Sequence, residues 1–401
     1  MSLFLKGTFD TVEECVSALA GGKMIILVDS HEREDEGDFV VAASKATAKQ
    51  VNFLLSNGRG VLCVPVSEQK AATLGFQRMT QNSDKFQTPF TVSVDAKSVS
   101  TGVSVEDRLK TIKLVSSSKT KAQDFVKPGH VFPLVSKHFG VLERQGHTEG
   151  AVDLMKLAGL SPAAVIVEIM NQNGSMARLR DLEKIRKKFG FRMLSIQQLV
   201  DYRLAREELL EKIASPRLPT EFGNFRVLGF SDKVLGKEYV AVTKGNVKGK
   251  HGVLCRIHSA CFTGDILFSK KCDCHEQLVE SLRLISKEGG VLVYALEHEG
   301  RGIGLLNKLR AYELQDKGLD TIEANEKLGF KADNRNYAMQ AQVIRALKIK
   351  SVRLLSNNPD KVSALEKYGV KVKSRVSLKI TPNVYNKDYL ETKKKRFAHM
   401  L

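Results

Sequence analysis

The chain has 401 residues, of which 42 % are apolar and 27 % charged, as is typical of a soluble globular protein. This composition excludes collagen-like and wholly disordered proteins, and no apolar run approaches the roughly 18 residues of a membrane span. From the length we expect two or three domains. Because the start lacks the layout of a secretion or transit signal, we expect a cytoplasmic protein with no membrane association. The net charge of +18 favours anionic partners without choosing among them.

Short β-rich runs alternate with helical patterns along the first half, which predicts mixed α and β layers. Predicted strands are 24–28, 39–43, 61–66, 90–95 and 163–170, and a helix is predicted over 149–158. A long amphipathic stretch over 196–213 is followed by SPRLPT at 215–220. Two prolines in six residues predict a semi-rigid connector between domains.

The second half repeats the alternation. Predicted strands are 252–258, 290–296 and 352–356, and predicted helices are 305–315, 336–348 and 360–369. The basic run KKKR at 393–396 is interpreted as a solvated helix end. We find no internal repeat and no low-complexity tract.

The loop DSHEREDEGD at 29–38 carries six carboxylates in ten residues. Such crowding is costly unless solvent screens the charges or a cation lies among the oxygens. Hard divalent ions such as Mg²⁺ prefer oxygen ligands of this kind. The loop therefore indicates a metal site, with a solvated hairpin loop as the alternative.

Three further segments add acid–base and anion-binding groups to this half. His130 follows a Pro-Gly turn, while Arg144, His147 and Thr148 lie at a glycine turn that opens a helix. Such a turn suits a phosphate or a metal ion. Glu168 stands in the apolar strand VIVEIM, where an unpaired carboxylate is costly and a salt-bridged structural Glu is the alternative. Together these groups suit enolisation of a phosphorylated sugar.

Five segments occur in order between about residues 10 and 203: EREDEGD, STGVSVEDR, KPGHVFPL, RQGHTEGAVDL and NGSMARL. With these segments the first half resembles 3,4-dihydroxy-2-butanone 4-phosphate synthase. The resemblance implies an α+β domain, residues 1–205, that uses Mg²⁺ or Mn²⁺ to convert ribulose 5-phosphate into dihydroxybutanone phosphate and formate. Ser30, His31 and Glu32 depart from the family's acidic loop.

The same resemblance implies roles for individual residues. Glu34 and His147 would bind the metal, and His130 and Glu168 would be the essential proton-transfer pair. The residues that would hold the sugar phosphate are Arg33, Glu34, Asp38, Arg144, Gln145, Gly146, His147 and Thr148.

Cys261, Cys272 and Cys274 form the pattern C-x₁₀-C-x-C. Three thiolates suit tetrahedral Zn²⁺ and leave a fourth position for water, as in catalytic zinc sites. Unpaired buried thiols are the alternative. Cys255 alternates with apolar residues in the strand GVLCRIH and is interpreted as a core residue, whereas His258 points to the opposite face.

Two more features of the second half suit a phosphorylated substrate. EHEGRGIG at 297–304 follows a strand and opens a helix, so its glycines let backbone N–H groups approach phosphate while Arg301 adds charge. Asp333 and Arg335 lie just before a predicted helix, where a surface ion pair or a helix cap is the alternative. The positive charge of this half suits a triphosphate.

Six segments occur in order over about residues 215–401: ASPRLPTEFGNFRV, RIHSACFTGDI, KCDCHEQL, EGRGIGLLNKLRAYELQDKGLDTIEAN, LLSNNPDKV and YLETKKKR. With them the second half resembles GTP cyclohydrolase II. The resemblance implies an α/β domain, residues 206–401, that opens the guanine imidazole ring of GTP at zinc and releases formate and pyrophosphate. Ala260 stands where the family has a glutamate directly before a zinc ligand.

Residue roles again follow from the resemblance. Cys261, Cys272 and Cys274 would bind zinc, Asp333 would accept a proton, and Arg335 would act as a nucleophile towards phosphorus. Tyr312 would lie near the guanine ring. GTP, with Mg²⁺ on its phosphates, would be contacted by Arg256, Ile257, His258, Ser259, Gln277, Glu299, Gly300, Arg301, Thr321, Ser356 and Lys361.

We therefore expect a fused, homodimeric enzyme that supplies both precursors of riboflavin. One alternative is that a single half is active and the other is a degenerate scaffold. The other is a nucleic-acid-binding or regulatory protein, which the absence of Trp and the 7 % of aromatic residues disfavour. We expect no specific nucleic-acid partner.

Overall fold

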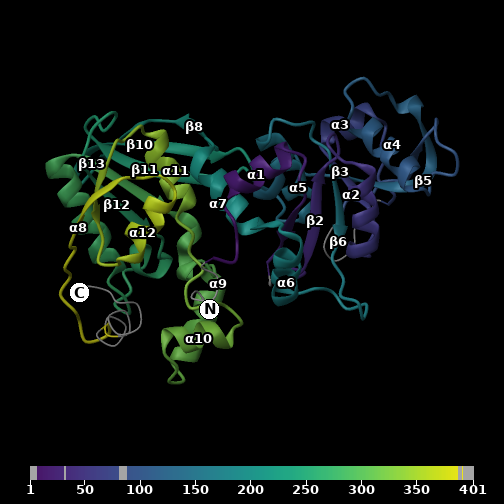
Figure 1. Cartoon of the computed structure of the whole chain (residues 1–401). Helices are drawn as coiled ribbons and strands as arrows, with labels where there is room; N and C mark the ends of the chain where they lie inside the picture. Colours follow the sequence, from purple (N-terminus) through teal and green to yellow (C-terminus); the bar gives the residue numbers. More distant parts are fainter. Residues whose placement is uncertain (1–6, 31–32, 81–87, 387–390, 392–401) are drawn as a thin grey trace. The chain divides into compact units, whose positions relative to one another are not determined.

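The computed structural model describes residues 7–30, 33–80, 88–386 and 391 and divides into two compact units, Met1–Arg203 and Leu204–Leu401 (Figure 1). His31, Glu32 and the basic run at 393–396 lie outside the described residues. In the described part of the chain, the helices lack the combination of length and apolarity needed to cross a bilayer.

The first unit contains a mixed seven-stranded sheet in the order β4-β5-β3-β6-β2-β1-β7. Its strands are β1 (Ile25–Val28), β2 (Gly37–Ala42), β3 (Cys63–Val66), β4 (Val94–Ala96), β5 (Phe125–Val135), β6 (Ala164–Glu168) and β7 (Arg192–Ser195). Its helices are α1 (Val12–Ala20), α2 (Ala48–Phe53), α3 (Glu68–Thr73), α4 (Val105–Ser116), α5 (His147–Leu157), α6 (Leu179–Phe189) and α7 (Ile196–Arg206), with short turns η1 (Leu54–Gly58), η2 (Ala122–Asp124) and η3 (Gly140–Leu142).

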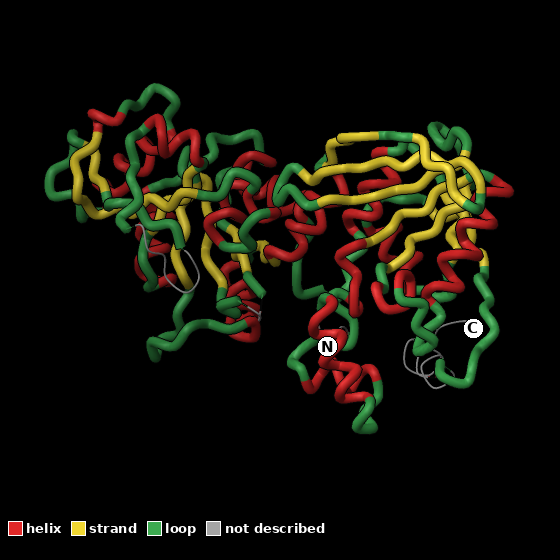
Figure 2. Tube along the Cα trace, turned by 180° about the vertical axis from the view of Figure 1, so that it is seen from behind, coloured by secondary structure: helices red, strands yellow, loops and turns green. Residues whose placement is uncertain are grey.

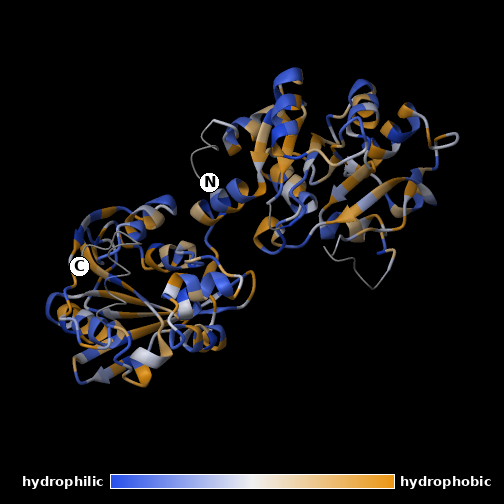
Figure 3. Ribbon diagram, turned by 90° about the horizontal axis from the view of Figure 1, so that it is seen from below, coloured by the Kyte–Doolittle hydropathy of each residue, from blue (hydrophilic) through white to orange (hydrophobic). Residues whose placement is uncertain are grey.

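Helices cover both faces of this sheet, which explains why its central strands are apolar runs without alternation. Ile25, Ile26 and Leu27 are all fully buried in β1. On one face the Phe39 ring packs edge-on against Phe53 at 5.4 Å between ring centroids. The orange, apolar positions in Figure 3 accordingly gather along the strands.

The second unit contains a sheet in the order β15-β14-β12-β13-β11-β10-β8, with β9 paired to β10. Its strands are β8 (Leu210–Ala214), β9 (Arg217–Thr220), β10 (Gly223–Asp232), β11 (Glu238–Lys244), β12 (Val253–Ser259), β13 (Gly290–Ala295), β14 (Val352–Leu355) and β15 (Val372–Val376). Its helices are α8 (Cys274–Glu288), α9 (Leu305–Gln315), α10 (Thr321–Lys327), α11 (Ala338–Ala346) and α12 (Asp360–Lys367), with turns η4 (Phe262–Ile266) and η5 (Leu296–Arg301).

The sheet of the second unit also has a core on each face. Ile285 of α8 packs with Leu254 and Leu292 on one face, while Ile344 of α11 packs with Ile257 on the other. The α9 and α10 helices extend away from the sheet (Figure 2) and pack against each other. Because α9 follows η5 at the end of β13, these helices stand beside the carboxyl ends of the parallel strands, where α/β proteins commonly place their sites.

Two predicted elements are wrong. The helix expected over 196–213 ends at Arg206, and residues 215–220 are not a connector, because Arg217–Thr220 pair with β10 inside the second unit's sheet. Main-chain pairing along β10 overrides the amphipathic pattern, and Pro219 is tolerated because β9 is an edge strand. The strand predicted at 90–95 also begins later, at Val94.

Candidate active sites

The acidic loop of the first unit is folded around Asp29, the residue that follows β1. Its carboxylate accepts hydrogen bonds from the main-chain N–H groups of Glu34 at 3.2 Å and Glu36 at 2.9 Å, and from the Arg33 guanidinium at 2.9 Å. Ligand atoms of Asp29, Glu34 and His147 lie within 4.8 Å of one another. Sequence reasoning predicted Glu34 and His147 but did not single out Asp29, although its place directly after a strand was a usable signal.

The electrostatics of this cluster fit a divalent cation. Burial lowers the pKa of His147 to about 4, so its imidazole is neutral and able to bind metal. Burial and the nearby Glu168 carboxylate raise the pKa of Asp38 well above its usual value. Asp38 Oδ1 and His147 Nε2 are both buried without a hydrogen-bond partner in the described part of the chain, which is costly unless a cation satisfies them.

The predicted phosphate-binding turn lies beside this cluster. The α5 helix begins at His147 with Gly146 as its N-cap, and Thr148 is buried in its first turn, whereas Gln145 is exposed. Arg144 forms a 2.6 Å ion pair with Glu149. A Cβ atom at Gly146 would lie 2.3 Å from the Arg144 guanidinium, so any other residue there would displace this side chain from its ion pair.

His130 has a partner that sequence reasoning missed. Asp95, in β4, accepts from the main-chain N–H of His130 at 2.9 Å and lies 2.7 Å from its Nδ1. Gly102 adopts a left-handed φ of 82°, and a Cβ there would lie 2.0 Å from the Asp95 carboxylate. Asp95 thus holds the imidazole through Nδ1 and leaves Nε2 outside this contact.

Glu168 differs from its prediction. It is half-buried at the end of β6 and accepts a 2.8 Å hydrogen bond from the main-chain N–H of Val61, so it is neither deeply buried nor unpartnered. It lies opposite Asp38 in the pairing of β2 with β6 and so joins the acidic cluster. His130 lies in β5 and Glu168 at the end of β6, the two strands that flank β3, so two strand spacings, roughly 10 Å, separate their strands.

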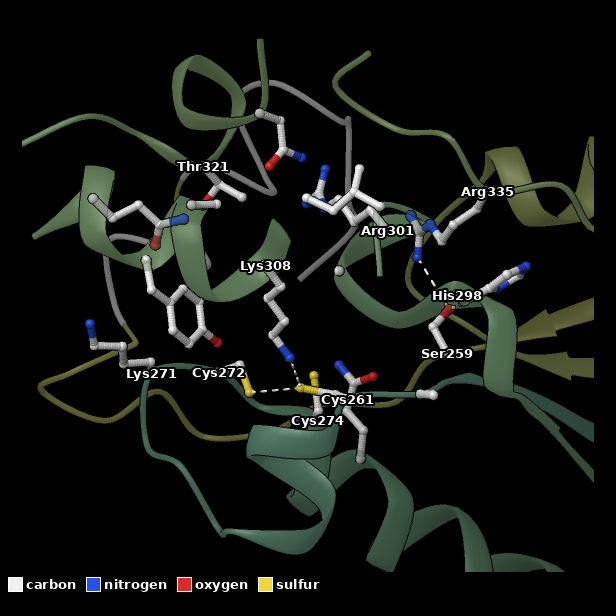
Figure 4. A pocket seen from close by; sticks show the side chains of 18 of the residues that line it. Ser259, Cys261, Lys271, Cys272, Cys274, His298, Arg301, Lys308, Thr321 and Arg335 are labelled. Atoms are coloured by element: carbon white, nitrogen blue, oxygen red, sulfur yellow. Dashed lines mark hydrogen bonds between the residues drawn. The ribbon is translucent and has the colours of Figure 1, made fainter. Parts of the chain in front are cut away.

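The three predicted zinc cysteines of the second unit do meet. Cys261 follows β12, and Cys272 and Cys274 lie at the start of α8 (Figure 4), with the three Sγ atoms within 4.8 Å of one another. The Sγ atoms of Cys261 and Cys272 are 3.7 Å apart. Ligands at about 2.3 Å in a tetrahedron are about 3.8 Å apart, so this spacing fits zinc. A Cβ at Gly264 would lie 2.8 Å from Cys272 Sγ, which explains the glycine.

A buried lysine completes this cluster and was not predicted. Lys308 of α9 places Nζ 3.1 Å from Cys261 Sγ and 2.7 Å from Glu299. Hydrogen bonds from the two other thiols and the ammonium charge lower the pKa of Cys261. Glu299 in turn accepts from the main-chain N–H of Phe262 at 2.6 Å, so it holds the Cys261 loop. Lys308 shares a helix face with Tyr312, and that spacing was the available signal.

The thiols lie in a pocket of about 580 Å³ that most of the predicted GTP residues line. The predicted residues in its wall are Arg256, His258, Ser259, Gln277, Gly300, Arg301, Thr321, Arg335, Ser356 and Lys361, with Tyr312 beside the thiols. Ile257 is an exception, because its side chain is buried in the core and only its carbonyl is used, accepting from Lys361 Nζ at 3.1 Å. Glu299 and Asp333 are not among the lining residues, but each contacts one of them: Glu299 pairs with Lys308, and Asp333 accepts from Arg335.

The pocket is cationic. Arg256 is 4 % exposed and donates to the Leu355 carbonyl at 3.0 Å and to the Gln277 amide. Arg335 donates through Nε to Asp333 at 2.9 Å, so the ion pair considered as an alternative is present, and its arginine faces the pocket. Cys255 is buried in the core, as predicted. The concentration of buried positive charge suits a polyanionic ligand.

Comparisons with known proteins agree with both halves. A family model of 3,4-dihydroxy-2-butanone 4-phosphate synthase matches residues 13–202, and one of GTP cyclohydrolase II matches residues 211–377. The riboflavin biosynthesis protein RibBA of Aquifex aeolicus (strain VF5) is 50 % identical over 397 residues, 98 % of each chain. RibBA of Bacillus subtilis (strain 168) is 47 % identical over 396 residues, which is 98 % of this chain and 99 % of that one.

A solved structure is similar over most of the chain. It is RibBX, a two-domain 3,4-dihydroxy-2-butanone 4-phosphate synthase from A. baumannii, with a TM-score of 0.67 and 30 % identity over 92 % of this chain and 99 % of that chain.

Fold, sites and comparisons together define a bifunctional enzyme of riboflavin biosynthesis, with a lyase and a hydrolase in one chain. The chain belongs to the RibBA family. The predicted fold class, an α+β domain followed by an α/β domain, is confirmed, as is the predicted pairing of dihydroxybutanone phosphate synthase with GTP cyclohydrolase II.

Proposed function

We propose that both units are catalytically complete. The first unit would form 3,4-dihydroxy-2-butanone 4-phosphate and formate from ribulose 5-phosphate. The second would hydrolyse GTP to the diaminopyrimidinone ribosyl phosphate, formate and pyrophosphate. The observation that carries this proposal is the meeting of three thiols, Lys308 and Tyr312 in a pocket walled by arginines and lysines.

In the first unit, Asp29, Glu34 and His147 would hold Mg²⁺ or Mn²⁺. When bound, the metal polarises the oxygens of the sugar so that adjacent C–H bonds become acidic. His130 and Glu168 would move protons at opposite ends of the substrate, in keeping with their separation of two strand spacings.

The sugar phosphate would be held by charge and by the helix start. Arg33 and Arg144 supply positive charge, and the N–H groups at the start of α5 point towards an anion. The remaining members of this set are Asp38, Gln145, Gly146 and Thr148. Asp95 would keep the proton of His130 on Nδ1.

In the second unit, Cys261, Cys272 and Cys274 would hold Zn²⁺, and Mg²⁺ would accompany the phosphates of GTP. When bound, zinc acts as the Lewis acid for opening of the imidazole ring. Arg335 would attack the α-phosphorus of GTP and displace pyrophosphate, while Asp333, which accepts its guanidinium hydrogen bonds, takes the guanidinium proton; water would then break the bond between Arg335 and phosphorus.

The rest of the pocket would bind GTP. Cationic groups from several segments converge on the space beside the thiols, so the triphosphate can be neutralised from several sides. Ile257 would contribute only main-chain atoms and Glu299 would act by holding the Cys261 loop. The remaining GTP contacts would be Arg256, His258, Ser259, Gln277, Gly300, Arg301, Thr321, Ser356 and Lys361.

One observation favours the alternative in which only one half is active: the solved relative RibBX has two domains but is named for the synthase alone. Against it, the three thiols meet, Asp333 accepts a hydrogen bond from Arg335, and Tyr312 lines the same pocket. Ala260 supplies no metal-binding atom, and its main-chain N–H pairs with the Ala295 carbonyl at 3.0 Å, so the backbone beside Cys261 is held without a carboxylate.

Further parts of the proposal concern organisation. The synthase domain would span residues 1–205 and the cyclohydrolase domain 206–401, and the enzyme would be a cytoplasmic homodimer without a specific nucleic-acid partner. Light scattering of the purified chain tests the dimer, and a monomer at micromolar concentration would contradict it.

Formate release tests the function directly. Purified protein with known zinc content is given ribulose 5-phosphate or GTP in separate samples with Mg²⁺. We expect formate in both. Formate from ribulose 5-phosphate alone would establish the degenerate alternative for the second unit, and silence in both would overturn the proposal.

A further inference from the structure

His298 is a buried histidine of the second unit that none of the roles above uses. It lies in η5, the turn that follows β13, and is 2 % exposed. Its ring packs edge-on against Tyr337 at 4.9 Å between centroids and faces the pocket beside Ser259 and Arg335 (Figure 4).

The hydrogen bonds of His298 define its tautomer. Nε2 lies 2.9 Å from the main-chain carbonyl of Asn336, which can only accept, so Nε2 carries a proton. Burial lowers the pKa of His298 to about 4, so the ring is neutral near pH 7 and Nδ1 has a free lone pair. Nδ1 lies 3.2 Å from Ser259 Oγ and must therefore accept the hydroxyl proton of Ser259.

The direction of the hydrogen bond from Ser259 to His298 determines how Ser259 can contact Arg335. Once its proton points to His298, Ser259 Oγ presents lone pairs to the other side, and Arg335 donates to it at 3.3 Å. The opposite edge of the guanidinium is held by Asp333, which accepts from Nε at 2.9 Å. Arg335 is thus held on two edges, by a carboxylate and by a hydroxyl whose orientation His298 dictates.

We propose that His298 is a positioning residue for GTP hydrolysis: through the Ser259 hydroxyl it fixes the guanidinium of Arg335 in the orientation required for attack on phosphorus. This inference rests on the proposed function of the second unit. His298 does not touch the reacting atoms, and its effect is to hold the nucleophile in place before substrate binds. Orientation of this kind contributes to the chemical step rather than to binding.

Two substitutions separate positioning from packing. His298→Phe keeps an aromatic ring against Tyr337 but removes both nitrogens, and we expect its kcat for GTP to fall by about 10- to 100-fold with KM changed less than about threefold. His298→Gln keeps a donor and an acceptor at the end of the side chain, so we expect its kcat to stay within about threefold of the wild type. Equal loss in both variants, or a change confined to KM, would overturn the proposal.

A double-mutant cycle tests the route through Ser259. If His298 acts through this hydroxyl, Ser259→Ala and the double variant with His298→Phe should have about the same kcat, because the second change removes nothing further. If the two substitutions reduced kcat by factors that multiply in the double variant, His298 would not act through the Ser259 hydroxyl. The matched control is Ser351→Ala, which deletes another buried hydroxyl of this unit that accepts a main-chain hydrogen bond, from Gly252 at 2.9 Å, away from the pocket. Its kcat should not change.

Nuclear magnetic resonance tests the geometry without turnover. Long-range ¹H–¹⁵N spectra at pH 7, with the signal assigned by its loss in His298→Gln, should show a neutral ring with the proton on Nε2. A proton on Nδ1 or a doubly protonated ring would overturn this inference even if GTP is hydrolysed. Wild-type protein that shows the expected tautomer but releases no formate from GTP would instead refute the proposed function of the second unit.

Discussion

The two units assemble their candidate metal-binding clusters by different routes. In the first, Asp29, Arg33 and Glu34 lie within one loop, and the main-chain N–H groups of that loop fold onto Asp29. In the second, the counter-charge comes from Lys308, which is 47 residues from Cys261 in sequence. The counter-charge of the first cluster therefore depends on the conformation of one loop, although His147 joins that cluster from α5, whereas the counter-charge of the second depends on the packing of a distant helix. Substitutions should therefore damage the two sites in different ways.

A large effect is expected where the loop itself is disrupted. Asp29→Asn replaces an acceptor of three hydrogen bonds, so we expect ribulose 5-phosphate turnover to fall by about 100-fold or more, because the loop no longer places Glu34. GTP turnover in the same sample should not change. Glu106→Gln, at an exposed carboxylate in α4, is the control and should be neutral in both assays. A first unit that keeps its activity in Asp29→Asn would mean that the loop is not organised by Asp29.

A smaller effect is expected for the partner of His130. Asp95→Asn keeps the shape of the side chain but weakens its hold on Nδ1–H, and we expect the kcat for ribulose 5-phosphate to fall by about 10- to 100-fold with little change in KM. Asp95→Glu should recover part of this loss. Wild-type kcat in Asp95→Asn would show that the contact is structural only.

Removal of the distant counter-charge in the second unit should weaken metal binding by the three cysteines rather than change the fold. Lys308→Met removes the only ammonium group within hydrogen-bonding reach of Cys261 in the described residues, and we expect zinc to pass to a competing chelator about tenfold faster. Lys308→Arg, which keeps the charge, should lie between the two. Because the readout is zinc transfer, it needs no substrate, and an unchanged rate would remove Lys308 from the account of the zinc site.

The last effect is on stability rather than on turnover, and it depends on pH. The folded-state pKa of His298 is lowered to about 4 from an ordinary value near 6.5, so the unfolded chain binds an additional proton between these values. The resulting stability is fully present above about pH 6.5 and declines as the pH falls, by about 2 kcal/mol from pH 7 to pH 5. Urea unfolding of the second unit at the two pH values should show a smaller difference for His298→Gln than for the wild type. Equal differences would contradict the assignment.

Much of this could be predicted because the signals are local. The helix at 305–315 was predicted to the residue, and the cysteine spacing predicted a cluster of three thiols that the structure brings together. Sequence patterns failed to predict the structure where contacts with residues distant in the sequence determine it. Residues 210–214 join a sheet through β10, and Glu168 obtains its partner from the main chain of Val61.

The residues that sequence reasoning missed share this cause. Asp95 is 35 residues from His130, Lys308 is 47 residues from Cys261, and His298 is 39 residues from Ser259. Each supports a predicted residue from a different element, and no local pattern marks such a relation. The sequence therefore predicted the groups that would react, while the structure shows which distant residues contact those groups.

The account's central claim is that one chain carries two independent active sites, and formate release by two reciprocal variants tests it most directly. Glu34→Gln should lose formate from ribulose 5-phosphate by about 1000-fold and keep formate from GTP. Cys272→Ser should do the reverse and should also lose its zinc. If either variant silences both reactions while remaining folded, or if neither silences the reaction assigned to it, the claim is contradicted.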